Sequence, residues 1–315
     1  MSKIRLTVVA PVYNEADVIG RFHARLGEVL ASLRDVESKI LYVVDPGTDN
    51  TVDILRDVVA CDSRTKVILL SARFGHQMSL IAGIDKALES DAIVMMDSDL
   101  QHPPELIPAL LEKYRHGFEI VHTFRTDTEE IGFLRKIAGN FFYYLLGKLS
   151  DLPMGSNVAD FRLISGRVAR IISSDFRERN MFLRGLLSWV GFKQSGIEYV
   201  AQKRGGGRSK YSLSRMFQFA SAGILSFSAR PLQIGVFLGI SFSFLSVLFI
   251  AWVIVQFLIS RALPSGWTTL VILLLLFSGI QLTVLGIIGA YIGGVFEEVK
   301  RRPRYLIEEE ISRND

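Results

Sequence analysis

Short apolar runs and helical spacings of apolar residues alternate along the first part of the chain. Apolar, β-branched runs predict five strands, at residues 4–10, 40–44, 66–70, 92–96 and 119–123. Apolar residues at helical spacing predict the segments between them as helices, at residues 18–33, 49–59, 77–88 and 103–115. Strands of this kind, separated by helices, indicate an α/β fold with a mostly parallel sheet and helices on both faces.

The pattern is less regular between residues 126 and 228. It predicts helices at 133–148, 168–172 and 181–190, a strand at 195–202, and an amphipathic helix at 212–228. Two runs without a formal charge follow, at 232–259 and 270–296, and each is longer than the roughly 20 residues that span a membrane. We therefore expect an α/β domain (1–211), a juxtamembrane helix (212–230), a transmembrane hairpin (231–297) and a charged tail (298–315).

Composition and charge agree with a membrane protein. Hydrophobic residues make up 49% of the chain, the mean hydropathy is +0.31, and the net charge is +4. Positive residues flank the hairpin on both sides, whereas its connecting link carries only Arg261. The positive-inside rule then predicts an integral membrane protein with the N-terminal domain and both termini in the cytoplasm. We expect the membrane to be a bacterial inner membrane. We expect no cleavable signal peptide, because the first residues lead directly into a strand.

Two further observations limit the possible partners. The single cysteine, Cys61, excludes an intrachain disulfide. The sequence has no basic face tied to a nucleic-acid-binding motif, and we expect no nucleic-acid partner. Glycines in the second membrane run could allow close helix packing, or they could reflect only the tolerance of membrane helices for glycine. Two membrane helices per chain are compatible with a homo-oligomer.

Acidic residues follow three of the predicted strands. Glu15 follows the first strand, Asp45 ends the second, and Asp97 and Asp99 end the strongly apolar fourth. Carboxyl ends of parallel strands meet at one edge of a sheet, so these carboxylates should converge there. A nucleotide-sugar explains such a site: carboxylates accept hydrogen bonds from ribose and base, and Mg²⁺ or Mn²⁺ bridges others to the diphosphate.

Several strings together resemble one family. Residues 10–15 (APVYNE) and 73–77 (RFGHQ) are accompanied by residues 96–106 (MDSDLQHPPEL), 160–163 (DFRL) and 182–185 (FLRG), and by the terminal hairpin. The chain resembles the polyisoprenyl-phosphate branch of the family 2 glycosyltransferases, which have the Rossmann-like GT-A fold. That branch includes dolichol-phosphate mannose synthases and bactoprenol glucosyltransferases. One departure is Pro46-Gly47 where the family usually has Gly-Ser, which alters the turn after the second strand.

The resemblance implies roles for particular residues. The expected nucleotide-sugar ligands are Pro11, Tyr13, Glu15, Asp45 and Asp97, and the expected metal ligands are Asp97, Asp99 and Gln101. The expected catalytic residues are Asp97, Asp99 and Asp160. For Asp160 the hypotheses are orientation of the acceptor or sugar, general base catalysis, or structural pairing with Arg162 or Arg184.

A polyisoprenyl phosphate is anionic at neutral pH, so the enzyme must hold two anions together, which requires cations. Candidates for binding the acceptor phosphate are Arg125, Arg135, Arg204, Arg208 and Lys210.

The resemblance implies that residues 1–211 are the catalytic domain and that the reaction is inverting, metal-dependent transfer of a hexose to undecaprenyl phosphate. Because the resemblance is nearest to the bactoprenol glucosyltransferases, the sugar we expect is glucose from UDP-glucose. Alternatives are a mannose synthase that uses GDP-mannose, a processive polysaccharide synthase, and an inactive sensor or scaffold that binds nucleotide-sugars. The synthase is disfavoured because such enzymes usually have more membrane helices and a Gln-x-x-Arg-Trp motif, which this sequence lacks.

Overall fold

The structure is a computed structural model, and it describes residues 3–126, 158–179, 181–200, 230–260 and 266–313. The chain divides into two compact units. The first contains residues 1–143, 152–216 and 302–315, and the second contains residues 144–151 and 217–301. The predicted helices at 133–148 and 212–228 lie outside the described residues.

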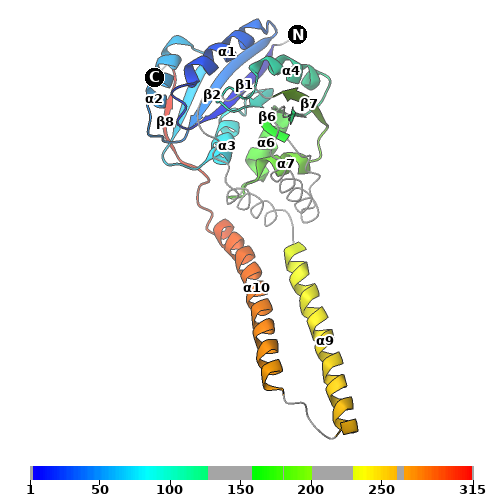
Figure 1. The fold of residues 1–315 in the computed structure, drawn as a ribbon. Coiled ribbons are helices and arrows are strands. Elements are labelled where there is room, and N and C mark those ends of the chain that lie inside the picture. Colours follow the sequence, from blue (N-terminus) through cyan, green and yellow to red (C-terminus); the bar gives the residue numbers. More distant parts are fainter. Residues whose placement is uncertain (1–2, 127–157, 180, 201–229, 261–265, 314–315) are drawn as a thin grey trace. The chain divides into compact units, whose positions relative to one another are not determined.

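The first unit is built on one eight-stranded sheet with the order β7-β5-β6-β4-β1-β2-β3-β8 (Figure 1). The pairs β1–β2, β1–β4, β2–β3 and β5–β7 are parallel, whereas β6 and β8 pair antiparallel with their neighbours. The strands are β1 (Ile4–Val12), β2 (Val36–Val44), β3 (Thr65–Leu70), β4 (Ala92–Met95), β5 (Ile120–Thr126), β6 (Val158–Ser165), β7 (Gln194–Val200) and β8 (Ile307–Ile311).

Helices cover both faces of this sheet. The helices of the first unit are α1 (Ile19–Ser32), α2 (Thr51–Cys61), α3 (His76–Lys86), η1 (Pro104–Leu106), α4 (Ile107–Arg115), α6 (Gly166–Asp175) and α7 (Leu183–Trp189). Buried side chains of α1, α2 and α4 form one continuous core with alternate residues of β1, such as Leu6 and Val8. The opposite face of the sheet carries α3, which packs on β1 and β2, and α6, which packs on α3 and β4.

One glycine allows α3 to approach the sheet closely. A Cβ atom at Gly83 would lie 2.2 Å from Cγ1 of Val9 and 3.3 Å from Cγ2 of Val43. Real Cβ atoms do not approach other atoms this closely, so a larger residue must push the helix away from β1 and β2. The position of the α3 N-terminus therefore depends on the absence of a side chain at residue 83.

The structure confirms the predicted α/β fold with a mostly parallel sheet, and it adds two strands that the apolar pattern did not predict. Strand β6 contains Asp160 and Arg162, so it is not one of the continuous apolar runs from which the other strands were predicted. Strand β8, with the sequence IEEEI, lies in the segment that we expected to be a charged tail.

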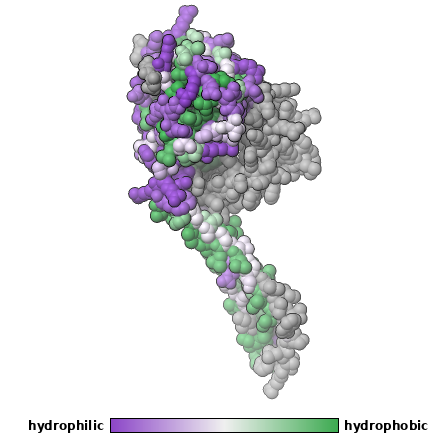
Figure 2. Space-filling view, turned by 90° about the vertical axis from the view of Figure 1, so that its left-hand side faces the viewer, coloured by the Kyte–Doolittle hydropathy of each residue, from purple (hydrophilic) through white to green (hydrophobic). Residues whose placement is uncertain are grey.

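The second unit contains two long helices, α9 (Arg230–Ser260) and α10 (Trp267–Val299). Their segments Leu232–Gln256 and Leu276–Val299 are long and apolar enough to cross a membrane. Figure 2 shows hydrophobic side chains along the visible helical surface, and many large ones are exposed, including Phe237 and Leu258. Water is a poor environment for such an extended apolar surface, whereas a bilayer would cover it.

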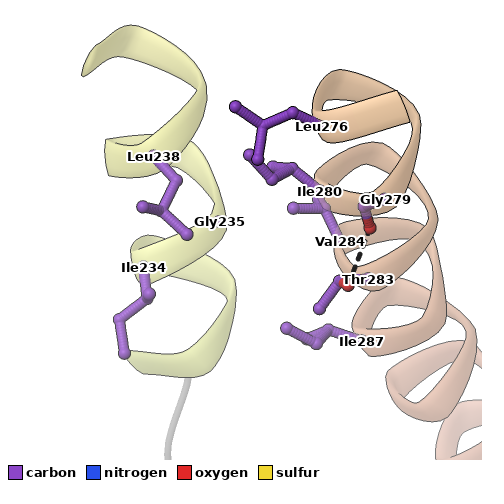
Figure 3. A pocket seen from close by; sticks show the side chains of 9 residues that line it. All are labelled: Ile234, Gly235, Leu238, Leu276, Gly279, Ile280, Thr283, Val284 and Ile287. Carbon is purple, nitrogen blue, oxygen red and sulfur yellow. Dashed lines mark hydrogen bonds between the residues drawn. The ribbon is translucent and has the colours of Figure 1, made fainter. Parts of the chain in front are cut away.

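A groove of about 310 Å³ lies between α9 and α10 (Figure 3). At one point the helices are close, because a Cβ atom at Gly235 would lie 3.3 Å from Val284. The Thr283 hydroxyl donates to the carbonyl of Gly279 at 2.8 Å, so it is satisfied within its own helix. The groove is otherwise lined by aliphatic residues, and this composition suits a hydrocarbon environment.

Candidate active site

The loops that follow β1 and β2 are joined by side-chain hydrogen bonds. The backbone N–H of Thr48 donates to Oδ1 of Asn14 at 2.9 Å, and Nδ2 of Asn14 donates to Oγ1 of Thr48 at 3.3 Å. Asn14 has φ = 54°, a left-handed conformation that Asn tolerates better than most residues. A Cβ atom at Gly47 would lie 2.1 Å from Oδ1 of Asn14, so the Pro46-Gly47 sequence leaves room for this contact.

A second set of bonds joins the same loops at the start of α2. Asp49 accepts from the backbone N–H of Ala16 at 3.1 Å and from the Thr51 hydroxyl at 2.7 Å. The N–H of Glu15 donates to Oγ1 of Thr51 at 3.0 Å. Burial would raise the pKa of Asp49, but the hydrogen bonds from Thr51 and Ala16 lower it. Asp49 is therefore ionised at neutral pH and holds two strand-end loops together.

Asp45, predicted as a nucleotide ligand, ends β2 and is only 3% exposed. Its carboxylate accepts from the backbone N–H groups of Phe74 and Gly75, at 3.3 and 2.9 Å, and from the Ser79 hydroxyl at 3.4 Å. Gly75 has φ = 91°, which glycine adopts without strain. Asp45 thus caps the entry to α3, and its role in nucleotide binding stays a prediction.

The loop after β4 presents the Asp97-Ser98-Asp99 sequence. The Ser98 hydroxyl donates to the Pro11 carbonyl at 3.1 Å, which links this loop to the end of β1. Oδ1 of Asp99 accepts from the backbone N–H of Gln101 at 3.1 Å. Between them Leu100 has φ = 66°, and such strain in a non-glycine residue is most often found at functional sites.

His102 supports the backbone at Asp97. Its Nδ1 accepts from the N–H of Asp97 at 3.0 Å, and its ring stacks on Phe161 with centroids 5.4 Å apart. His102 is 6% exposed, so it supports the site from beneath.

His76, the first residue of α3, lies between two of the predicted catalytic carboxylates. Its Nε2 is 3.5 Å from Oδ1 of Asp97 and 3.6 Å from Oδ2 of Asp160. Partial burial would lower the pKa of His76, but Asp160 and Asp97 raise it above its ordinary value. The direction of this shift favours an imidazolium at neutral pH, and His76 connects the β4 loop with β6.

Asp160 also contacts two arginines. Nη2 of Arg162 donates to one carboxylate oxygen at 2.7 Å, and Nη2 of Arg184 donates to the other at 2.9 Å. Burial would raise the pKa of Asp160, but His76, Arg184 and Arg162 lower it well below its ordinary value. Burial lowers the pKa of Arg162 to about 10, which leaves it charged at neutral pH. Asp160 is consequently a poor proton acceptor, and the structural pairing that the sequence left open is present with both arginines.

The β4 loop has the donor types that a hard divalent cation prefers. Asp97 and Asp99 supply carboxylate oxygens, and the side chain of Asp97 is 34% exposed. Oε1 of Gln101 accepts from Nη1 of Arg125 at 3.3 Å, and an amide oxygen has a second lone pair. Among the described residues, no group of three or more His, Cys, Asp or Glu side chains is placed to hold a metal alone. The loop fits a cation that takes its remaining ligands from substrate phosphates and water, as Mg²⁺ often does.

Two predicted residues occupy the rim. The guanidinium of Arg73 lies over the ring of Tyr13, 3.9 Å from its centroid, in a cation–π contact. Arg125 contacts Gln101, so a candidate acceptor ligand lies beside a candidate metal ligand. Arg135, Arg204, Arg208 and Lys210 lie outside the described residues, and their roles stay predictions.

The structure therefore brings Asp97 and Asp160 together through His76, whereas Asp45 supports the base of α3. Sequence reasoning gave His76 no function and treated Arg162 and Arg184 only as structural partners of Asp160. Both arginines lie within strings that carried the family resemblance, residues 160–163 (DFRL) and 182–185 (FLRG). The sequence therefore pointed to these two arginines only through the combination of motifs that resembles the family, and not through either residue alone.

Comparison with known proteins gives a consistent result. Residues 7–170 match the family described as glycosyl transferase family 2. The uncharacterized glycosyltransferase YkcC of Bacillus subtilis is 39% identical over 97% of this chain and 94% of its own length. A bactoprenol glucosyl transferase derived from the SfII prophage of Shigella flexneri is 35% identical over 97% and 98%. Among solved structures, mannosyl-3-phosphoglycerate synthase from Rubrobacter xylanophilus shares the fold, with a TM-score of 0.50 and 16% identity over 73% of this chain and 74% of that one.

Proposed function

Because the chain belongs to glycosyl transferase family 2, we propose that it transfers glucose from UDP-glucose to undecaprenyl phosphate. The proposed reaction inverts the anomeric configuration and requires Mg²⁺ or Mn²⁺. The names of the bactoprenol glucosyl transferases, which match nearly the whole chain, support both the sugar and the lipid acceptor. The two membrane-length helices support a lipid substrate, because helices of this length and composition would hold such an enzyme at a membrane.

The donor is proposed to bind at the carboxyl ends of β1, β2 and β4. Asp97 and Asp99 would hold the cation, which when bound offsets the negative charge of the departing diphosphate. Tyr13 and Arg73 form a flat cationic surface at the rim that suits a nucleotide. The bonds of Asn14 and Asp49 between the β1 and β2 loops keep this edge in place before the donor arrives.

The observation that best supports a phosphate acceptor over a hydroxyl acceptor is the environment of Asp160. A hydroxyl acceptor needs a base to remove its proton, and Asp160 is unsuited to this because three cationic side chains contact it. A phosphate monoester needs no base, because it is already an anion at neutral pH, with a second pKa of about 6. His76, Arg162 and Arg184 surround Asp160 with positive charge, which supports an anionic acceptor close to these side chains.

The lipid phosphate would then attack the anomeric carbon from the face opposite the diphosphate. An α-linked donor would give a β-linked product. Basic residues Lys300, Arg301 and Arg302 follow α10, and Arg230 begins α9. By the positive-inside rule these residues support a catalytic unit on the cytoplasmic side of the membrane.

The test is transfer of radiolabelled sugar to undecaprenyl phosphate in detergent. A panel of UDP- and GDP-sugars is compared with and without Mg²⁺ or Mn²⁺, for the wild type and for Asp99→Ala. We expect labelled lipid from UDP-glucose that requires the cation and is lost in Asp99→Ala. The anomeric configuration of the product, read by NMR, tests inversion.

Asp35→Ala serves as the matched control, because Asp35 is an exposed carboxylate whose side chain forms an ion pair with Arg115, away from the candidate site. It should retain wild-type transfer. Label from GDP-mannose alone would replace glucose with mannose in the proposal. Nucleotide-sugar binding without labelled lipid from any donor would contradict a lipid-directed transferase and favour a sensor.

A further inference from the structure

The chain that leaves α10 is attached to the first unit by a buried ion pair. Nη2 of Arg304 donates to Oδ2 of Asp85 on α3 at 3.1 Å, and its Nη1 donates to the carbonyl of Phe176, just after α6, at 3.0 Å. The Tyr305 hydroxyl donates to the same Asp85 oxygen at 2.8 Å. The Arg304 side chain is 7% exposed. We name Asp85, Arg304 and Tyr305 the Arg304 clamp.

Strand β8 extends this attachment. The N–H of Ser71 donates to the carbonyl of Leu306 at 3.0 Å, and β8 then pairs antiparallel with β3 (Figure 1). Glu309 forms two hydrogen bonds with Arg56, at 3.0 and 2.5 Å, and Glu310 pairs with Lys86. The residues after the second membrane-length helix are thus integrated into the catalytic unit.

The link between α10 and the clamp is short. Helix α10 ends at Val299, and only residues 300–303 separate it from Arg304. Fully extended chain spans at most about 3.3–3.6 Å per residue, so this link reaches roughly 18 Å. The link therefore sets a covalent limit on the distance between the end of α10 and Arg304.

We propose that the Arg304 clamp positions the catalytic unit for an acceptor that is embedded in the membrane. This inference rests on the proposed function. The clamp fixes the point on α3 and α6 to which α10 is tied, and so limits how far the active site can move from the bilayer surface. Its residues contact one another and Phe176 and are not among those that we assign to the donor, the cation or the acceptor, so a soluble acceptor that diffuses into the site should not need them.

The experiment uses the full chain in liposomes and compares two acceptors in the same preparation. One is undecaprenyl phosphate in the bilayer, and the other is a short, water-soluble prenyl phosphate. For the double variant Asp85→Asn/Arg304→Gln, we expect kcat with the membrane acceptor to fall about tenfold or more, because small misplacements of reacting groups are costly. Transfer to the soluble acceptor and the KM for the donor should stay at wild-type values.

A second variant leaves the clamp intact and lengthens the link. Inserting about eight Gly and Ser residues after Arg302 adds a flexible spacer, and we expect the same selective loss. Arg115→Gln is the matched control, because it breaks an exposed ion pair with Asp35 elsewhere on the unit. It should transfer sugar to both acceptors like the wild type.

The possible outcomes of this experiment test the role of the Arg304 clamp separately from the proposed sugar transfer. Equal loss with both acceptors would assign the clamp a structural role only and overturn the inference. Unchanged transfer to the membrane acceptor in both variants would also overturn it, with the proposed function intact. A wild type that labels neither acceptor would refute the proposed function and, with it, this inference.

Discussion

At the scale of single residues, Asp160 is the carboxylate on which three cations converge. Replacing it by Asn keeps the shape but leaves Arg162, which is 1% exposed, without its ionic partner. Breaking a buried ion pair in this way typically costs about 3–5 kcal/mol. We expect Asp160→Asn to lower the free energy of unfolding of the catalytic unit by an amount in that range, measured by denaturant titration at pH 7. Asp35→Asn, at an exposed pair, should change it little.

The same residue predicts a pH dependence. The folded-state pKa of Asp160 is below its value in the unfolded chain, which is about 3.9. Its stabilising contribution is therefore complete above about pH 4 and is lost as the pH falls through the folded-state pKa. Denaturant titrations between pH 7 and pH 3 should show a fall in wild-type stability on the acid side that is smaller in Asp160→Asn. Parallel curves for the two proteins would contradict this assignment.

His76 gives a prediction about activity. Because it contacts both Asp97 and Asp160, His76→Gln should disturb the carboxylate that we assign to the cation. We expect sugar transfer to fall about 10–100-fold, as is common when a residue that orients a metal ligand is lost. His116→Gln, at an exposed position after α4, is the control. Unchanged transfer in His76→Gln would show that Asp97 does not depend on this contact.

At the scale of elements, α3 joins the sheet to the site, and Gly83 sets the distance between them. Gly83→Ala places a Cβ atom against Val9, and overpacking of this kind costs about 1–3 kcal/mol. Gly20→Ala in α1 is the matched control, because no atom lies within 4 Å of its added Cβ. That change should be neutral or stabilise the protein by up to about 1 kcal/mol. Thermal unfolding of both variants tests the difference, and equal effects would contradict the packing argument.

A strand or helix can be predicted from the sequence when its neighbours in the fold are apolar. It is harder to predict when its polar side chains are paired with residues far away in the chain. Strands β1 to β5 are apolar because helices or neighbouring strands cover them, so the pattern of residues alone predicts them. Strand β6 is different, since its Asp160 and Arg162 are paired within the fold. The glutamates of β8 resemble a solvated tail, and only the folded chain shows that Arg56 and Lys86 meet them. The contacts of His76 with Asp97 and Asp160 exist only in the folded chain, so the sequence around His76 does not reveal its role.

At the scale of the whole molecule, the native cysteine can test the proposed orientation. Cys61 is exposed at the end of α2 and is the single cysteine of the chain. If the catalytic unit is cytoplasmic, an impermeant maleimide should label Cys61 only after cells are permeabilised. A cysteine introduced at Ser265, between the two membrane-length helices, in a Cys61→Ser background should be labelled in intact cells. The reverse pattern would place the catalytic unit outside.

Strand β8 has a consequence for how the protein is made. A ribosome delivers β1 to β7 first, then both membrane-length helices, and after them the residues that pair with β3. Until residues 307–311 are made, the β3 edge lacks the partner strand β8, and unpaired edges of this kind invite aggregation. Because α9 and α10 precede β8 in the chain, β8 can reach the sheet only after both helices have been made. If α9 and α10 insert into a membrane as proposed, the sheet is thus completed after the membrane segments are made, and a chain truncated before residue 307 would lack β8 at this edge.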